Sequence, residues 1–173
     1  MEKEYKTDRY NHPPPYQAPT TPRPFLPPSG VRIPLNFPLD SAFPSPAQTR
    51  EPPCRDADGS PVFIGSAIFQ HSVHPCKIAP HLSPPCHVPY GGTEVEHLGR
   101  YDLLPFDPQT MEWVQTSFGR IPDKRNPVQG GYEENGARLY HAIARVQGTL
   151  VPGKTGEHLV RIFILPMKLL HDV

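Results

Sequence analysis

Beyond residue 53, apolar residues gather in short runs rich in β-branched and aromatic side chains, separated by polar residues, glycine and proline. Such runs predict strands. We expect them at Pro61–Gln70, His87–Tyr90, Arg100–Leu104, Met111–Ser117, Arg138–Gln147 and His158–Leu165. No window of ten or more residues repeats its apolar positions at helical spacing. The pattern therefore predicts an all-β fold, a compact antiparallel β domain.

Turn signals frame two of these strands. Asp58-Gly59 and Asn135-Gly136 precede the runs at 61 and 138, and an Asx-Gly pair supplies the positive φ that a tight turn needs. A second turn is expected after each strand, at Pro75-Cys76-Lys77 and at Pro152-Gly153-Lys154.

The first 53 residues differ from the rest, with 14 of the 26 prolines. Because proline removes a backbone donor and fixes φ, Pro13–Pro53 is expected to be extended, with neither helix nor sheet. Domain boundaries are placed at residues 1–53 for this tail and 54–173 for the β domain. Large apolar residues between the prolines suit a tail that lies along a partner surface. Pro13, Pro14, Pro15 and Tyr16 match the PPxY pattern bound by WW domains, although an extended spacer could contain the same residues.

Composition narrows the functional classes. Seventeen basic and seventeen acidic side chains cancel, which argues against a nucleic-acid binder, since such proteins need a basic surface. No apolar run is long enough to span a bilayer, and the N-terminus lacks the apolar stretch of a signal peptide. Three cysteines make no disulfide framework. These observations predict a cytoplasmic protein without a cofactor; they leave its oligomeric state open, a homodimer included.

The β domain contains an internal self-match. A shift of 77 positions aligns Asp56–His81 with Glu133–His158 without a gap. Identical residues coincide at Gly59/Gly136, Ala67/Ala144, Pro75/Pro152, Lys77/Lys154 and His81/His158. The match predicts two tandem repeats, the first at about 54–106 and the second at about 111–165.

Several motifs in order resemble the DM-nine repeat family. They are Gly131-Tyr132-Glu133, Leu139-Tyr140, Leu150-Val151-Pro152-Gly153-Lys154, Trp113-Val114, Gly119 with Ile121-Pro122, Val88–Glu94 and Tyr101-Asp102-Leu103-Leu104. The resemblance covers about residues 54–165. It departs in two places: the first copy lacks the tryptophan-containing opening, and the second lacks the closing Tyr-Gly-Gly segment.

Each copy carries an acidic residue followed 21 positions later by a lysine, namely Asp56 with Lys77 and Glu133 with Lys154. A carboxylate accepts from hydroxyls and an ammonium donates to them, so such a pair could hold a vicinal diol without a metal. A surface ion pair is the alternative. The resemblance implies a mannose site at these four residues, with each lysine an exposed donor. Tyr132 and Trp113 could supply an apolar face for the sugar ring.

Other chemistries find weaker support. Gly148–Thr155 matches the P-loop pattern, but a strand-like run follows it where a helix is required. His71, His74, Cys76, His81, Cys86 and His87 could ligate zinc, although their segment, 71–87, reads as an irregular loop and zinc binding stays open. There is no GxSxG motif and no supported carboxylate pair, so we expect no enzyme.

Two functions remain after these exclusions. The first is a non-enzymatic, lectin-like module that binds mannose-type glycans. The second is a structural component of a large cytoskeletal or axonemal assembly, for example a microtubule-associated one, with the β domain docked and the tail threading along the partner.

Overall fold

A computed structural model describes residues 30–116, 120–121, 125–159 and 165–169 of the chain. Within these residues lie twelve strands and one short helix. The elements are β1 (Ile33–Leu35), α1 (Pro46–Thr49), β2 (Cys54–Arg55), β3 (Pro61–Ile68), β4 (Val73–Ile78), β5 (Cys86–Tyr90), β6 (Thr93–Glu96), β7 (Tyr101–Leu104), β8 (Met111–Trp113), β9 (Gln129–Tyr132), β10 (Arg138–Val146), β11 (Thr149–Thr155) and β12 (Leu165–Leu169). The predicted all-β class is confirmed.

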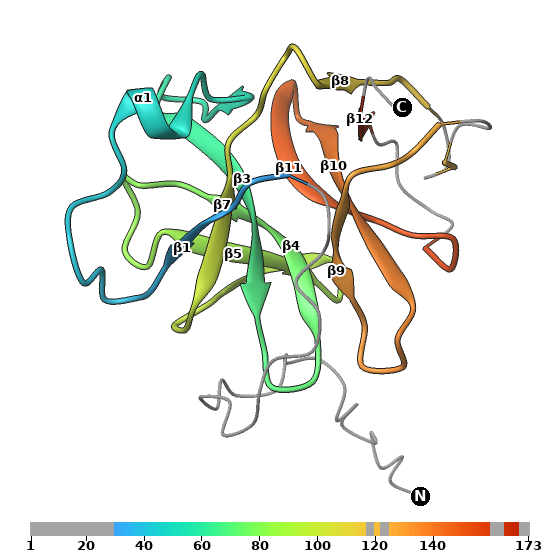
Figure 1. The fold of residues 1–173 in the computed structure, drawn as a ribbon, viewed down its shortest axis with the longest axis horizontal. Helices are drawn as coiled ribbons and strands as arrows, with labels where there is room; N and C mark the ends of the chain where they lie inside the picture. The colour runs from blue at the N-terminus through green and yellow to red at the C-terminus, as the bar shows by residue number, and fades with distance from the viewer. Residues whose placement is uncertain (1–29, 117–119, 122–124, 160–164, 170–173) are drawn as a thin grey trace, which may run out of the picture.

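Every strand pairing among the described residues is antiparallel. The strand order is β1-β7-β3-β4-β9-β10-β12-β8, with β2, β5, β6 and β11 attached at the sides. In Figure 1, β3, β4, β5 and β7 (green to yellow) form a first group of strands and β9, β10 and β11 (orange) a second, which meets the first where β9 lies beside β4. A single registered pair, Val73 of β4 with Tyr132 of β9, connects the two groups.

The two groups are related in detail by the 77-residue offset. Ile64 pairs with Lys77 across β3 and β4, and His141 pairs with Lys154 across β10 and β11, which is the same register. The turns before β3 and β10 match as well, because the backbone N–H of Gly59 donates to Asp56 and that of Gly136 to Glu133, both at 2.9 Å. This equivalence supports a duplicated unit, so the two-repeat prediction is retained.

The turns predicted at Asp58-Gly59 and Asn135-Gly136 are present, with glycine φ angles of 86° and 83°. Those predicted at Pro75-Cys76-Lys77 and Pro152-Gly153-Lys154 are wrong, since these residues lie within β4 and β11. The described pairings show how the prolines fit. Pro152 faces only β10, and the second neighbours of β4 register at Val73 on one side of Pro75 and from Lys77 on the other. At neither proline does a second neighbouring strand require a backbone N–H, which proline lacks.

The strand predictions are accurate for β3, β5, β7 and β10, within one or two residues at each end. Of the predicted strand Met111–Ser117, only Met111–Trp113 is a strand, and residue 117 lies outside the described residues. For the predicted strand His158–Leu165, His158 and Leu159 are not in a strand, 160–164 lie outside the described residues, and β12 starts at Leu165.

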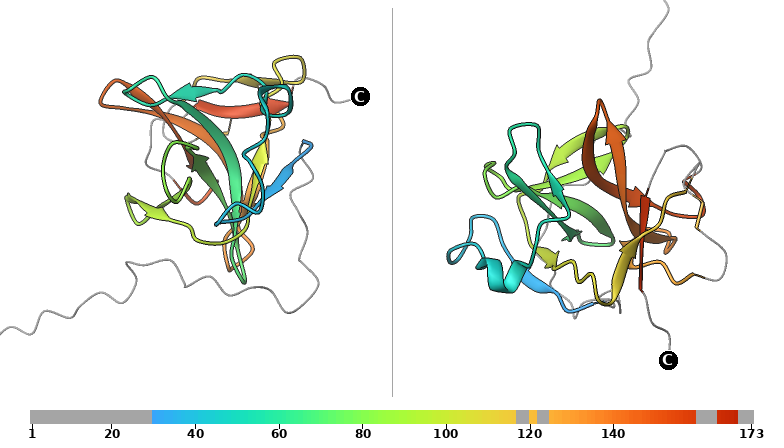
Figure 2. Two further views of the ribbon diagram at one scale, coloured as in Figure 1. Left: turned by 90° about the vertical axis from the view of Figure 1, so that its left-hand side faces the viewer. Right: turned by 90° about the horizontal axis from the view of Figure 1, so that it is seen from above.

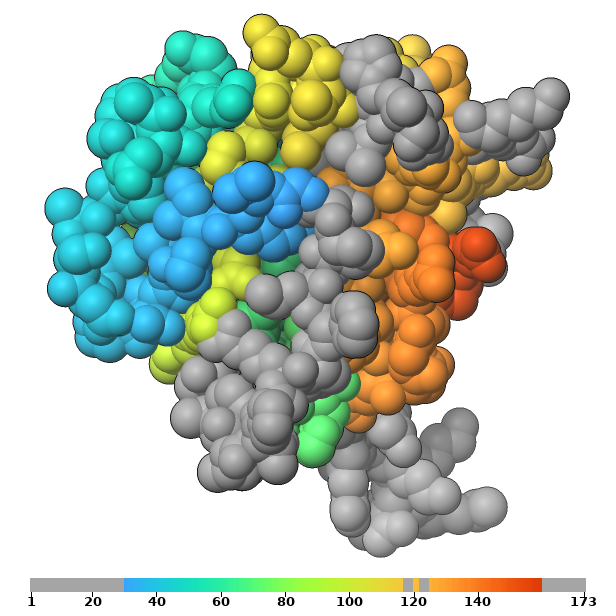
Figure 3. Space-filling view, in the orientation of Figure 1, coloured from blue at the N-terminus to red at the C-terminus, as the bar shows by residue number. Residues whose placement is uncertain are grey.

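The N-terminal segment from residue 30 to 53 packs on the β domain, as the blue and cyan residues in Figures 1, 2 and 3 show. Strand β1 pairs with β7, and residues 46–49 form α1. The prediction that Pro13–Pro53 forms neither helix nor sheet is therefore wrong for these two elements. The prolines argued against a strand here, yet Ile33–Leu35, with Pro34 at its centre, pairs in register with Tyr101–Leu103 of β7.

Apolar side chains of this segment complete the largest core cluster. Leu35 is buried, and Ile33, Phe37 and Phe43 pack against buried residues of β3, β4, β5 and β7. Arg32 adds polar anchors, donating to Ser66 Oγ at 2.8 Å and to the carbonyl of Gln129 at 2.7 Å. Its guanidinium thus links the segment 30–53 to both groups of strands.

The P-loop pattern at 148–155 forms the β10–β11 connection and β11 itself. Thr155 ends the strand and the next described residues form a turn, so the helix N-terminus that would hold a phosphate is not found at this point. Across the described residues, no helix is long and apolar enough to cross a membrane.

Candidate functional site

Asp56, Lys77, Glu133 and Lys154, which the sequence singled out, form two clusters around the equivalent turns. In each, the acid follows β2 or β9 and the lysine lies on β4 or β11. The first acid–lysine cluster comprises Asp56, Lys77, His81 and Glu94. The second comprises Glu133, Lys154, His158 and His74. The prediction that each lysine comes back beside the acid 21 positions before it is therefore confirmed in both clusters.

In the first acid–lysine cluster, Lys77 Nζ donates to Glu94 Oε2 at 3.0 Å and lies 4.0 Å from Asp56 Oδ1. Asp56 Oδ2 is 3.1 Å from His81 Nε2. His81 thus contacts the acid, while Glu94 of β6, a strand that pairs with β5 and not with β4, makes the closest contact with the ammonium. Two carboxylates consequently surround one lysine.

In the second acid–lysine cluster, Lys154 Nζ donates to Glu133 Oε1 at 3.0 Å and contacts His74 Nδ1 at 3.0 Å. His158 Nε2 lies 3.8 Å from Glu133 Oε1. Burial tends to raise the pKa of Glu133, but the hydrogen bond and charge of Lys154, with the nearby histidines, outweigh it and hold that pKa below its usual value. Glu133 is thus kept as an acceptor.

The lysine side chains are only 10% exposed at Lys77 and 13% at Lys154. The expectation that each is an exposed donor is wrong. Each lysine is largely enclosed, and its ammonium group faces a carboxylate.

A cleft of about 750 Å³ lies between the β5–β6 hairpin and the β10–β11 hairpin. Its lining includes Lys154 and His158 from the second cluster, Glu94 from the first, and Tyr90. The Tyr90 ring centroid is 5.4 Å from Lys154 Nζ. Cation, carboxylate and aromatic face, the elements that grip a sugar, therefore meet in one concave surface.

Tyr90 is the aromatic residue that the sequence did not identify as a site residue, although it ends the Val88–Glu94 motif. Trp113 and Tyr132, the two aromatic residues that the sequence suggested for a sugar-binding face, are not among the residues that line the cleft. Trp113 stacks on Phe106, with ring centroids 5.7 Å apart, and packs on the core. Tyr132 is half-buried on β9, where burial raises its pKa.

Segment 71–87 is not irregular throughout, since β4 and the first two residues of β5 are strands, whereas residues 79–85 between them form turns and bends. Cys76 and Cys86 are buried in the largest apolar cluster, and burial raises the pKa of Cys86 well above the usual value. Among the residues that the structure describes, no three His, Cys, Asp or Glu side chains are placed to hold a metal ion. Pro13, Pro14, Pro15 and Tyr16 lie outside the described residues.

Comparison with known proteins agrees with the motifs. The sequence model of the DM9 repeat matches residues 56–168 of the chain. A search of curated proteins finds no significant match. The matched region starts at Asp56 and includes both acid–lysine clusters and the cleft.

Proposed function

The chain belongs to the DM9 repeat family, whose domain is a lectin-like module of the carbohydrate-binding type rather than a catalytic one, and we propose that it binds mannose-type glycans through its acid–lysine clusters. The observation that carries the proposal is the recurrence of acid, lysine and histidine at equivalent positions beside both turns. Asp56, Lys77, Glu133 and Lys154 are the proposed binding residues.

The chemistry suits a pair of neighbouring hydroxyl groups. An ammonium donates to hydroxyl oxygens and a carboxylate accepts from hydroxyl hydrogens, so a vicinal diol satisfies both partners at once. The ring of Tyr90 offers an apolar face to the C–H groups of a sugar. Of the four proposed residues, Lys154 lines the cleft, together with Glu94 and Tyr90.

Binding of the full chain to a glycan array and to methyl α-mannoside by calorimetry tests the proposal. The double variant Lys77→Ala with Lys154→Ala should lose detectable binding, because each charge-assisted bond contributes about 1.5–3 kcal/mol, about ten- to a hundredfold. Arg145→Ala is the matched control, since Arg145 is an exposed cation on β10 that donates to Gly148. A wild-type chain that binds no mannose-type glycan would refute the proposal.

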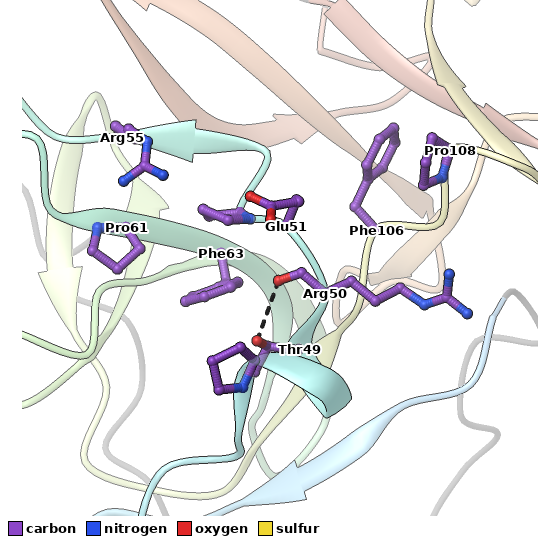
Figure 4. Close-up of a pocket in the computed structure, with 10 residues that line it drawn as sticks. Thr49, Arg50, Glu51, Arg55, Pro61, Phe63, Phe106 and Pro108 are labelled. Atoms are coloured by element: carbon purple, nitrogen blue, oxygen red, sulfur yellow. Dashed lines mark hydrogen bonds between the residues drawn. The ribbon is translucent and has the colours of Figure 1, made fainter.

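A second candidate function is the structural role in a cytoskeletal or axonemal assembly. A groove of about 540 Å³ beside α1 favours it, lined by prolines and by Phe63 and Phe106 (Figure 4). Aromatic and proline side chains make surfaces that suit extended proline-rich chains. Proximity labelling from the N-terminus should then enrich one large assembly, whereas enrichment of glycoproteins would support the lectin-like function.

A further inference from the structure

His74 lies in the second acid–lysine cluster although it belongs to β4, in the first group of strands. Its side chain is 5% exposed, and its Nδ1 is 3.0 Å from Lys154 Nζ. At the corresponding position of the second copy, 77 residues later, stands Val151. The contact between His74 and Lys154 therefore has no counterpart in the first acid–lysine cluster.

The hydrogen bonds define the tautomer of His74. A lysine ammonium only donates, so Nδ1 must accept and carry no proton. The other ring nitrogen, Nε2, then carries the proton and faces Ser72 Oγ at 3.0 Å. A neutral ring with a defined tautomer satisfies both contacts, and an imidazolium would not.

The groups around the ring favour the neutral form. Burial and the charge of Lys154 lower the pKa of His74 to about 4, with His97 adding to the effect and Glu133 opposing it. Tyr90 lies edge-on, with ring centroids 6.1 Å apart. His74 thus stays an acceptor through neutral and mildly acidic pH.

This acceptor fixes the direction of the ammonium. Of three N–H donors on Lys154, Glu133 Oε1 accepts one and His74 Nδ1 a second. The two contacts hold Nζ in one position, and the third N–H is left for a ligand in the cleft that Lys154 lines.

We infer that His74 is a positioning residue that orients the Lys154 ammonium toward a glycan in the cleft, an inference that rests on the proposed function. The second acid–lysine cluster therefore combines His74 from the first group of strands with Glu133 and Lys154 from the second. His74 does not contact the glycan; it acts through Lys154.

Calorimetry of the full chain with methyl α-mannoside tests this role. His74→Gln keeps an acceptor and a donor and should bind within about threefold of wild type, whereas His74→Leu keeps bulk but no acceptor and should bind about tenfold more weakly. His71→Leu, at an exposed histidine of the β3–β4 turn, should bind like wild type. Thermal melts verify that each variant folds.

Nitrogen-15 NMR of the ligand-free chain supplies a second measurement. The His74 ring should show the Nε2–H tautomer at neutral pH, and the Nδ1–H tautomer would overturn the inference whether or not a glycan binds. Wild-type binding that His74→Leu leaves unchanged would overturn the positioning role alone. A wild-type chain that binds no mannoside would refute the proposed function and this inference with it.

Discussion

The two acid–lysine clusters share their backbone geometry and differ in what completes them. Lys77 is matched by a second carboxylate, Glu94, while Lys154 is matched by a neutral histidine and the ring of Tyr90. The cleft lining includes Lys154 but not Lys77. Equivalent turns and registers thus place the same residue types in different electrostatic surroundings.

The difference shows how neighbouring elements decide what a repeated motif can do. A lysine held between two carboxylates gains its ionic partners within the protein, which favours a stabilising role. A lysine beside one carboxylate and one neutral acceptor is less fully neutralised by its neighbours, so its positive charge attracts a ligand more strongly. We therefore expect the first cluster to contribute more to stability and the second more to glycan affinity.

The largest expected effect comes from the N-terminal segment, which packs on the first group of strands. Removing residues 1–50 deletes β1, Arg32 and the apolar contacts of Leu35 and Phe43. Fully burying one large side chain contributes about 1.5–3 kcal/mol. The buried Leu35 and the partly buried Ile33, Phe37 and Phe43 together therefore contribute several kcal/mol, which is a large part of the stability of an ordinary domain, about 5–15 kcal/mol. Circular dichroism should show no cooperative unfolding transition.

Removing only residues 1–29 is the control for this truncation, since every contact named above is kept. That shorter deletion should unfold cooperatively. A stable, cooperative 51–173 fragment would show instead that the β domain does not need β1, as the boundary predicted from the sequence implies.

The connection between the two groups gives the next largest effect. Gly131 has a φ of 154°, and a Cβ there would overlap the carbonyl oxygen of Val73. Gly131→Ala should lower the free energy of unfolding by about 3 kcal/mol, from strain and steric overlap. The residue in the same position of the first copy is Cys54, and Cys54→Ala should cost only about 1 kcal/mol. Urea denaturation compares the two, and equal costs would contradict the proposed strain at β9.

Exchanging each lysine for methionine tests the functional contrast directly. Lys77→Met leaves two carboxylates without their cation and should cost about 2 kcal/mol of stability, whereas Lys154→Met leaves one and should cost about 1 kcal/mol. Mannoside affinity should show the opposite order, with the greater loss in Lys154→Met. Chemical denaturation and calorimetry give both values, and the same order in the two measurements would break the comparison.

The smallest expected effect is on how the free energy of unfolding changes as the pH falls. The folded pKa of His74, about 4, lies below the usual value of 6.5, so the unfolded chain binds more protons between these pH values. His74 therefore reduces stability as pH falls from about 6.5 toward 4. His74→Val introduces the residue type of the equivalent position 151 and should lessen the stability loss between pH 7.5 and 5.5 by about 1 kcal/mol. An unchanged loss in urea titrations would contradict a neutral, buried His74.

Sequence reasoning was most accurate where local chemistry decides the structure. Asx-Gly pairs gave the turns at Gly59 and Gly136 because few residues adopt positive φ readily. It failed at Pro75 and Pro152, which read as turns but lie in strands whose partners leave the proline nitrogens unpaired. No local signal reports whether a strand has one neighbour or two.

Residues of the candidate site divide in the same way. The pairing of Lys77 with Asp56 and of Lys154 with Glu133 followed from their equal spacing in two copies. The sequence did not predict the partners His74, Tyr90 and Glu94. His74 and Tyr90 reach Lys154 because of how β4 and β5 lie relative to β11, and Glu94 reaches Lys77 because of how β6 lies relative to β4.

The sequence by itself determined the β class, the turns and the recurrence of acid and lysine, since these depend on residue type and on spacing along the chain. Tertiary structure alone decided that β1 and Arg32 join the β domain and that Lys77 faces Glu94. It also brought His74 to Lys154, 80 residues away in the chain. Such contacts arise from sheet order and from burial of both faces of β3 and β4, which no single stretch of sequence encodes.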